Sequence, residues 1–279
     1  MKKLLFAILT ILVTTACYGQ QFNVITYNIR LNTSSDGINA WPNRKEMVTA
    51  LLKFHDAAIF GLQEAKHDQI LDLEERLPGF GRLGSGRDDG KTGGEYSPVF
   101  YDLNLFKLLE SGQFWLSETP ETPSKGWDAA LPRIVTWGKF QVKGSSRKFF
   151  YFNTHFDHVG KVARANSSRL ILEKIKTLNP GNLPVIVTGD FNLTPESEPI
   201  TLILEKLKDS SQISAMPPYG PVGTFNSFRR DHPLDQRIDY IFVNDKVSVL
   251  KYGVLTDGWD NRYPSDHQPV MATVKLNKK

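Results

Sequence analysis

Cysteine is almost absent from this chain. One cysteine, Cys17, occurs among 279 residues, and it lies near the N-terminus. The rest of the chain can therefore form no disulfide, and its core alone must hold the fold together. The sequence also has neither a cysteine cluster nor a His-x-x-x-His pair, so we do not expect a closed zinc site.

Long apolar runs are confined to the N-terminus. Two lysines follow Met1, an apolar run covers 4–13, and small residues come next. This arrangement predicts a secretory signal peptide over residues 1–19, because the run is too short to span a bilayer as a mature helix. No later segment is long and apolar enough to be transmembrane. We therefore expect an exported protein, periplasmic or extracellular, with a single domain over 20–279.

Cys17 leaves one alternative to soluble export. Cleavage before this residue would allow a lipid to be attached to its thiol, and Ala16 suits such processing. Thr14, however, stands where the usual lipoprotein signal has Leu or Val. We expect soluble export, with lipid anchoring through Cys17 as the alternative.

An excess of positive charge is also lacking. The formal net charge is +4, and it falls to +2 when the leader takes Lys2 and Lys3 with it. No run of five or more basic residues occurs. This balance is weak evidence for nucleic acid as a partner, because such proteins usually concentrate basic residues on one face.

Strand and helix patterns intermix along the chain, without a linker that would mark a second domain. Strands are expected at 22–29, 57–62, 133–142, 148–155, 183–188, 247–252 and 270–276, and helices at 41–54, 66–77, 161–178 and 200–207. The region 81–94 reads as a Gly-rich loop at the rim of a substrate site. Hairpins in the middle of the chain fit poorly with a regular βα barrel. We predict an α/β fold, a four-layer α-β-β-α sandwich of two packed mixed β-sheets.

Residues able to carry chemistry stand at or beside the ends of apolar segments. They are Asn28, Glu64, His155, Asp190, Asn192, Asp239, Asp266 and His267. Binding sites in open α/β sheets collect at such ends, and carboxylate oxygens suit Mg²⁺. Each residue alone would more often be a turn former, a helix cap or a packing histidine. Together they indicate a site that could hydrolyse a phosphoester.

Six short motifs carry a family resemblance over about residues 22 to 276. They are Thr26-Tyr27-Asn28-Ile29, Gly61-Leu62-Gln63-Glu64, Asn153-Thr154-His155-Phe156-Asp157, Gly189-Asp190-Phe191-Asn192, Arg237-Ile238-Asp239-Tyr240-Ile241 and Ser265-Asp266-His267-Gln268-Pro269. In this order they resemble the endonuclease/exonuclease/phosphatase superfamily, which deoxyribonuclease I typifies. The resemblance implies a deoxyribonuclease I-like fold and a metal-dependent hydrolase acting on ester bonds.

The resemblance also implies a metal and a substrate site. Glu64 would bind Mg²⁺, with Mn²⁺ as an alternative ion, and Asn28 and Asp266 would lie near it as further ligands. Arg133 and Asn28 would contact the substrate, and the match for Arg133 is looser than the others.

Five residues would take part in catalysis by in-line attack of water on phosphorus. Asp190 would orient or deprotonate the water, and Asn192 would contact the phosphoryl group. His267, oriented by Asp239, would stabilise the displacement. His155 would lie near the scissile phosphate and assist the leaving group.

The identity of the substrate stays open at this point. We expect a monomer that acts on a small or glycan-linked phosphodiester or phosphomonoester. An extracellular nuclease for DNA or RNA is the enzyme alternative. A non-catalytic binding domain that keeps the fold is the rival from a different class.

Overall fold

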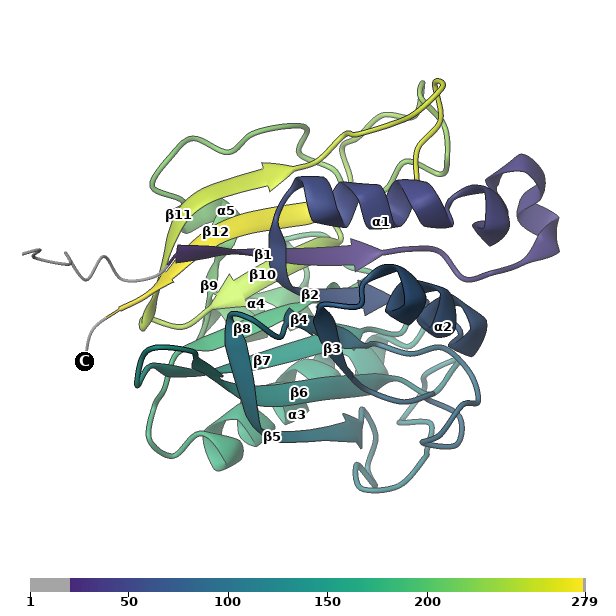
Figure 1. Ribbon diagram of the computed structural model, residues 1–279. Coiled ribbons are helices and arrows are strands. Elements are labelled where there is room, and N and C mark those ends of the chain that lie inside the picture. The colour runs from purple at the N-terminus through teal and green to yellow at the C-terminus, as the bar shows by residue number, and fades with distance from the viewer. Residues whose placement is uncertain (1–20, 278–279) are drawn as a thin grey trace, which may run out of the picture.

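The computed structural model describes residues 21–277 and contains two β-sheets packed face to face (Figure 1). The first has six strands, in the order β11 (Val247–Val254), β12 (Val270–Leu276), β1 (Gln21–Asn28), β2 (Ala57–Gln63), β4 (Val99–Asp102) and β3 (Phe80–Leu83). The second also has six, in the order β5 (Phe106–Trp115), β6 (Ile134–Val142), β7 (Lys148–His155), β8 (Val185–Asp190), β10 (Asp239–Val243) and β9 (Lys208–Asp209). Both sheets are mixed, because β1–β2 and β7–β8 are parallel pairs among antiparallel neighbours.

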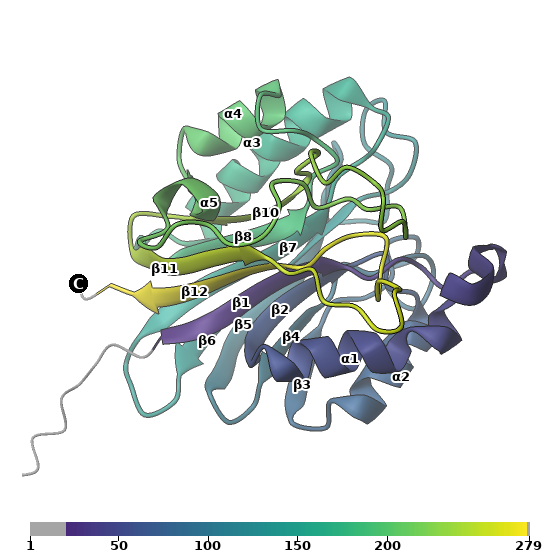
Figure 2. The ribbon, with the colours of Figure 1, turned by 90° about the horizontal axis from the view of Figure 1, so that it is seen from above.

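Helices cover the outer face of each sheet (Figure 2). The first sheet carries α1 (Lys45–Phe54) and α2 (His67–Arg76), and the second carries α3 (Lys161–Leu178), α4 (Glu198–Leu204) and the short α5 (Ser210–Ile213). The predicted four-layer α-β-β-α sandwich is therefore confirmed. None of the helices in the described part of the chain has the length and apolar character needed to cross a membrane.

The strands are apolar on both faces because each sheet is buried on both sides. In β1, Val24 faces the core between the sheets, whereas Ile25 and Tyr27 face α1 and α2. In α1, Val48 and Leu51 are buried at helical spacing while the polar side faces solvent. Burial of a side chain such as Leu51 contributes about 1.5–3 kcal/mol. The alternating and helical patterns of the sequence thus produce three stacked hydrophobic layers.

A buried polar cluster joins the two sheets near one edge. Gln63 Nε2 donates a hydrogen bond of 2.7 Å to Asn153 Oδ1, and Thr188 Oγ1 donates one of 3.0 Å to the same atom. Asn153 Nδ2 in turn donates to Leu62 O at 2.8 Å. Gly61 allows this approach, because a Cβ there would lie 2.2 Å from Asn153 Oδ1. The cluster fixes β2 against β7 and β8 directly beneath the edge where the candidate residues lie.

Two local expectations differ from the structure. The region predicted as a loop over 81–94 overlaps β3, a half-buried strand that pairs with β4. The helix predicted over 41–54 is divided: a 3-10 turn, η2 (Trp41–Asn43), precedes α1, which begins at Lys45. The predicted signal peptide and Cys17 lie outside the described residues.

Candidate active site

The candidate residues meet at one edge of the sandwich because two parallel pairs of strands, β1–β2 and β7–β8, end there. Asn28 is the last residue of β1, and Glu64 directly follows β2. His155 ends β7 opposite Asp190, which ends β8. Since β10 is antiparallel to β8, its first residue, Asp239, also pairs with Asp190. The segment before β12 brings Asp266 and His267 to the same edge, which β1 points towards in Figure 1.

A cavity of about 510 Å³ opens at this edge. The predicted residues that line it are Glu64, Arg133, His155, Asp190, Asn192, Asp266 and His267. Asn28 and Asp239 are fully buried and contact lining residues from behind. All of the predicted site residues therefore come together in one place.

Asn28 orients the carboxylates through its amide. Its Oδ1 accepts the backbone N–H of Arg30 at 3.0 Å, which fixes the direction of the side chain. Its Nδ2 consequently donates to Glu64 Oε1 at 3.0 Å and to Asp190 Oδ2 at 2.9 Å. In this geometry the amide N–H groups of Asn28 face the two carboxylates, and its role as a metal ligand stays a prediction.

Glu64 and Asp266 form the donor set best suited to a hard cation. Burial raises the pKa of Asp266, and the nearby carboxylate of Glu64 raises it further, while His267 and Arg30 oppose the effect. Arg30 lies 3.8 Å from Glu64 and 3.9 Å from Asp266. Two carboxylates held together in this way fit a divalent ion that keeps several waters. These residues would hold the metal implied by the motifs.

A second group of buried side chains could also hold a metal ion. Asp190, Asp239 and His267 each offer one ligand atom within 4.8 Å of the others. His267 Nδ1, however, is engaged at 2.9 Å by Asp239 Oδ2. We therefore interpret this group as an oriented histidine beside a carboxylate, next to the Glu64–Asp266 donor set.

Strained backbone accompanies the site. Arg30, Glu64 and Asn192 have φ angles of 56°, 62° and 52°, in the left-handed region that L-residues adopt at a cost. Such conformations cluster at functional sites, where surrounding contacts enforce them. Here the contacts of Asn28 and Asp190 supply that enforcement, because Asn192 N donates to Asp190 Oδ1 at 2.9 Å.

Asp190 is the central carboxylate of the site. Its Oδ2 lies 3.5 Å from His155 Nε2 and 3.8 Å from His267 Nε2. Burial, followed by the charge of Asp239, raises the pKa of Asp190 to about 7, although His267 and Asn28 oppose the shift. A carboxylate with this pKa can accept a proton near neutral pH.

His267 is held as a cation. Its Nδ1–H donates to Asp239 Oδ2, which leaves Nε2 facing Asp190 and the cavity. Burial alone would lower the pKa of His267, but the charges of Asp239 and Asp190 outweigh burial and raise it well above the usual value. A protonated imidazole at this position can stabilise negative charge on a phosphoryl oxygen.

His155 is held as a neutral ring. Asn192 Nδ2 donates to Phe156 O and lies 3.0 Å from His155 Nε2, so this ring nitrogen is the acceptor and Nδ1 carries the proton. Burial, then the charges of Arg133 and Arg87, lower the pKa of His155 well below the usual value.

Glu95 and Arg87 belong to the site but were not found from the sequence. Glu95 lines the cavity, and its Oε2 lies 3.9 Å from His155 Nδ1. Arg87 binds both oxygens of Glu95, at 2.7 Å and 3.1 Å. Both residues belong to an irregular segment without periodicity, so only the fold shows that they approach His155. In the sequence, the one signal for these residues was an arginine and a glutamate on opposite sides of the Gly-rich loop, where they could form an ion pair.

Arg133 supplies an anion-binding group. It is only 4% exposed and lines the cavity, yet its Nε and Nη1 have no hydrogen-bond partner among the described residues. The nearest carboxylate oxygen, from Asp157, lies 3.6 Å from Nε. Buried donors without partners are rare in folded proteins, and they are explained here if a ligand oxygen occupies the cavity.

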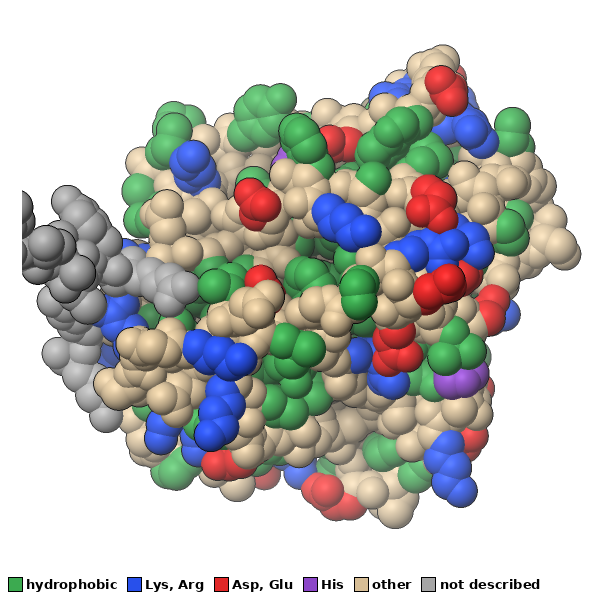
Figure 3. All heavy atoms as spheres, in the orientation of Figure 1, with side chains coloured by type: hydrophobic (Ala, Val, Ile, Leu, Met, Phe, Trp, Pro, Cys, Tyr) green, Lys and Arg blue, Asp and Glu red, His purple; other side chains and the backbone are tan. Residues whose placement is uncertain are grey.

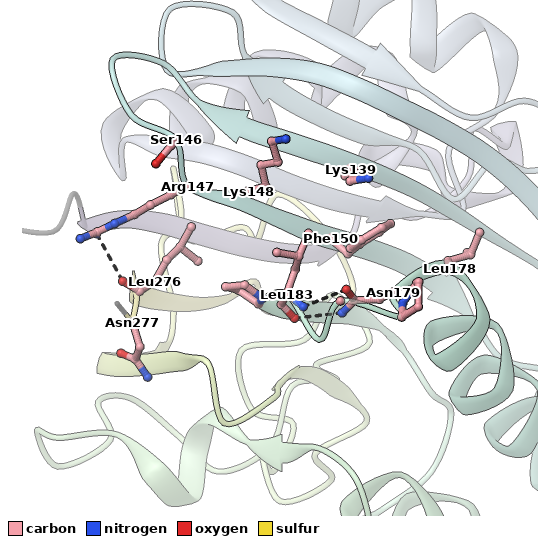
Figure 4. A pocket seen from close by; sticks show the side chains of 13 residues that line it. Lys139, Ser146, Arg147, Lys148, Phe150, Leu178, Asn179, Leu183, Leu276 and Asn277 are labelled. Carbon is pink, nitrogen blue, oxygen red and sulfur yellow. Dashed lines mark hydrogen bonds between the residues drawn. The ribbon is translucent and has the colours of Figure 1, made fainter. Parts of the chain in front are cut away.

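A second hollow lies elsewhere on the protein, between the β6–β7 turn, the α3–β8 loop and the end of β12 (Figure 4). Its volume is about 600 Å³, and Lys139, Arg147 and Lys148 line it together with Phe150. No carboxylate or imidazole occurs among its lining residues. It therefore lacks the groups that metal binding and proton transfer require.

The fold and the first cavity together define a class: an α/β sandwich enzyme with a metal-binding acidic site. Comparison with known proteins agrees, because the model of the Endonuclease/Exonuclease/phosphatase family matches residues 25–267. The chain belongs to this family. Its members hydrolyse phosphoester bonds, and the chain is accordingly a hydrolase acting on ester bonds.

Solved structures of relatives have the same architecture. An endonuclease/exonuclease/phosphatase family protein of Bacteroides thetaiotaomicron is 41% identical, with a TM-score of 0.88 over 93% of this chain and 99% of that one. A mannosyl-6-phosphatase of Bacteroides thetaiotaomicron VPI-5482 is also 41% identical, with a TM-score of 0.88 over 91% of this chain and 100% of that one. The human Nocturnin catalytic domain is 22% identical, with a TM-score of 0.72 over 92% and 95%, and it shares the fold.

The curated relatives are more distant and mostly longer. At 27% to 28% identity, the chain spans between 28% and 68% of their length.

Proposed function

We propose that the protein is an exported Mg²⁺-dependent phosphatase that releases inorganic phosphate from a phosphorylated sugar. The observation that carries this proposal is the convergence of Asp190, His267, the Glu64–Asp266 donor set and buried Arg133 on one cavity. Each group serves a separate need of phosphoester hydrolysis: a base, two sources of positive charge and a metal site.

The chain's own residues account for the steps of an in-line reaction. Asn28 and Asn192 fix the two oxygens of Asp190, which takes the proton of the attacking water at Oδ2. His267 Nε2 donates to a phosphoryl oxygen, while Asp239 holds the ring. The bond from phosphorus to the ester oxygen breaks as the new one forms, and the leaving alcohol takes up a proton from bulk water. A cation bound by Glu64 and Asp266 would offset the charge on the phosphoryl oxygens.

A monoester is favoured over a diester by the charge of the site. A phosphomonoester carries more negative charge than a diester near neutral pH, and Arg133 offers a buried guanidinium with unpartnered N–H groups. The similarity to a mannosyl-6-phosphatase over almost the whole of both chains also supports a phosphorylated sugar.

The surface gives less support to a nuclease. Basic and acidic side chains are interspersed on the face shown in Figure 3, where no continuous basic track leads to the edge that bears the site. Nucleic-acid binding without a basic track would lack the electrostatic term that dominates affinity.

The decisive experiment measures phosphate release from mannose 6-phosphate, with cleavage of bis-p-nitrophenyl phosphate and DNA measured in parallel, each with Mg²⁺ and with EDTA. We expect Mg²⁺-dependent release from the sugar phosphate and little DNA cleavage. DNA cleavage without turnover of any sugar phosphate would support the nuclease alternative instead.

Export and oligomeric state are further parts of this proposal. The leader predicted over 1–19 supports export, and N-terminal sequencing of the mature protein would distinguish cleavage after Gly19 from lipid modification at Cys17. Light scattering would test the expected monomer.

A further inference from the structure

The carboxylate of Asp157 hydrogen-bonds to two segments at the mouth of the cavity and holds them together. Its Oδ1 accepts the backbone N–H groups of Val159 at 2.9 Å and Gly160 at 2.7 Å. Its Oδ2 accepts those of Ala130 at 3.1 Å and Leu131 at 3.3 Å. The connection from β7 to α3 is thereby fixed against the segment that leads into β6. His158, which lies in this connection, has a defined backbone position beside the cavity.

Arg133 determines which ring nitrogen of His158 carries the proton. Its Nη2 lies 3.1 Å from His158 Nδ1. A guanidinium has five N–H donors and no acceptor, so Nδ1 must be the acceptor in this contact. A neutral imidazole carries its single proton on the other nitrogen, and Nε2 of His158 is therefore an N–H donor. The His158 main chain is also held, because Arg164 Nη1 donates to its carbonyl at 3.2 Å.

His158 and Leu131 form the outer wall of the cavity on this side. Both line it, His158 is exposed, and Leu131 is 39% exposed. Arg133 lies behind them and is 4% exposed. A phosphate that reached the buried guanidinium would thus leave its alcohol portion beside an N–H donor of fixed direction and an apolar side chain. This pairing suits a sugar, whose ring carries hydroxyls at its edge and C–H groups on its face.

We propose that His158 determines specificity for the alcohol half of the substrate, by donating from Nε2 to a hydroxyl of the leaving sugar while Leu131 contacts its C–H face. The proposal rests on the phosphatase function proposed above and adds the residue that selects the sugar. His158 contacts neither the attacking water nor the ester oxygen, so it acts in recognition, and Arg133 positions it.

The test compares His158→Ala with the unchanged enzyme on two monoesters, a hexose 6-phosphate and p-nitrophenyl phosphate. The aryl ester has no hydroxyl beside its ester bond. We expect kcat/KM for the sugar phosphate to fall by about tenfold, the value of one neutral hydrogen bond, while that for the aryl ester is unchanged. His158→Gln keeps an N–H donor and should recover part of the loss. His67→Ala is the matched control, because this exposed histidine does not line the cavity.

A second measurement needs no substrate. The ¹⁵N spectrum of the protein should show His158 with a bare Nδ1 and a protonated Nε2, and Arg133→Gln should change that pattern. Equal losses on both esters in His158→Ala, or no loss on either, would overturn the proposal while leaving the phosphatase function intact. If the protein without substitution hydrolyses neither ester, the proposed phosphatase function is itself wrong.

Discussion

Two histidines approach the same oxygen of Asp190, and their surroundings differ. His267 is hydrogen-bonded at 2.9 Å to Asp239, whose carboxylate has no other hydrogen-bond partner among residues 21–277, and the pKa of His267 is raised. His155 is 3.9 Å from Glu95, a carboxylate already bound twice by Arg87, and its pKa is lowered. One edge of the sandwich thus holds a cationic and a neutral imidazole about one carboxylate.

The two rings are about equally buried, so the difference between their pKa values comes from the charges around them. Both histidines are almost fully buried, at 5% and 7% exposure. Burial would lower the pKa of each. For His267 the charges of Asp239 and Asp190 together outweigh burial and raise the pKa, whereas for His155 the charges of Arg133 and Arg87 reinforce the lowering by burial.

The largest expected effect follows from removing the carboxylate between the two rings. Asp190→Asn should reduce kcat by about 10³-fold or more, because it removes the base and leaves both histidines without their shared partner. Phosphate release by the purified variant would measure this, with circular dichroism to verify folding. Asp245→Asn, at an exposed acid away from the cavity, is the control. Near-normal turnover by Asp190→Asn would contradict the assignment.

Removal of the Asp239 carboxylate should give the next largest effect on kcat. Asp239→Asn should lower kcat by roughly 10²–10³-fold and lower the pKa of His267, because the raised pKa depends first on that charge. Titration of the His267 ring by NMR in metal-free protein would measure the second quantity directly. If the His267 pKa did not change, Asp239 would not be needed to raise it, and the charge of Asp190 would be the main cause.

Removal of the Glu95 carboxylate near His155 should affect kcat less. Glu95→Gln should reduce kcat by about tenfold or less, since Glu95 makes no hydrogen bond to His155 and its charge is already balanced by Arg87. Both variants would be assayed with the same substrate. A loss as large as that of Asp239→Asn would mean that the two histidine–carboxylate pairs are equivalent.

Asp157 provides a carboxylate held by backbone amides instead of by an imidazole. Despite the opposing effect of burial, the N–H groups of Gly160, Val159 and Ala130 lower the pKa of Asp157 to about 2. Because the folded-state pKa is depressed, the stabilisation is present above the usual carboxyl pKa near 4 and is lost as the pH falls towards 2.

Asp157→Asn should therefore reduce the free energy of unfolding by roughly 1–2 kcal/mol at neutral pH and by less at about pH 3. Urea unfolding at the two pH values would measure this. A difference that stays constant with pH would mean that the carboxylate charge contributes nothing.

Much of the edge could be predicted from the sequence because strand periodicity locates strand ends. Asn28, Glu64, His155, Asp190 and Asp239 each stand at or beside such an end, and parallel pairing brings those ends together. Their roles in binding and catalysis stay predictions that the experiments above test.

The remaining parts of the site depend on contacts between segments that no local pattern connects. Glu95 reaches His155 from an irregular loop, and Arg133 meets His158 across 25 positions of sequence. β3 was missed because a short, half-buried strand containing Gly81 has little periodicity. These features arise from tertiary packing, which overrides weak local preferences.

The pairing of β1 and β12 near the two ends of the described chain has a practical consequence. Gln21 at the start of β1 lies opposite Lys275 near the end of β12, at the edge remote from the cavity. A support coupled near either residue would therefore face away from the cavity mouth. The protein could therefore be immobilised in one orientation through these strands. A large, branched substrate would still have access to the site, because the cavity would face away from the support.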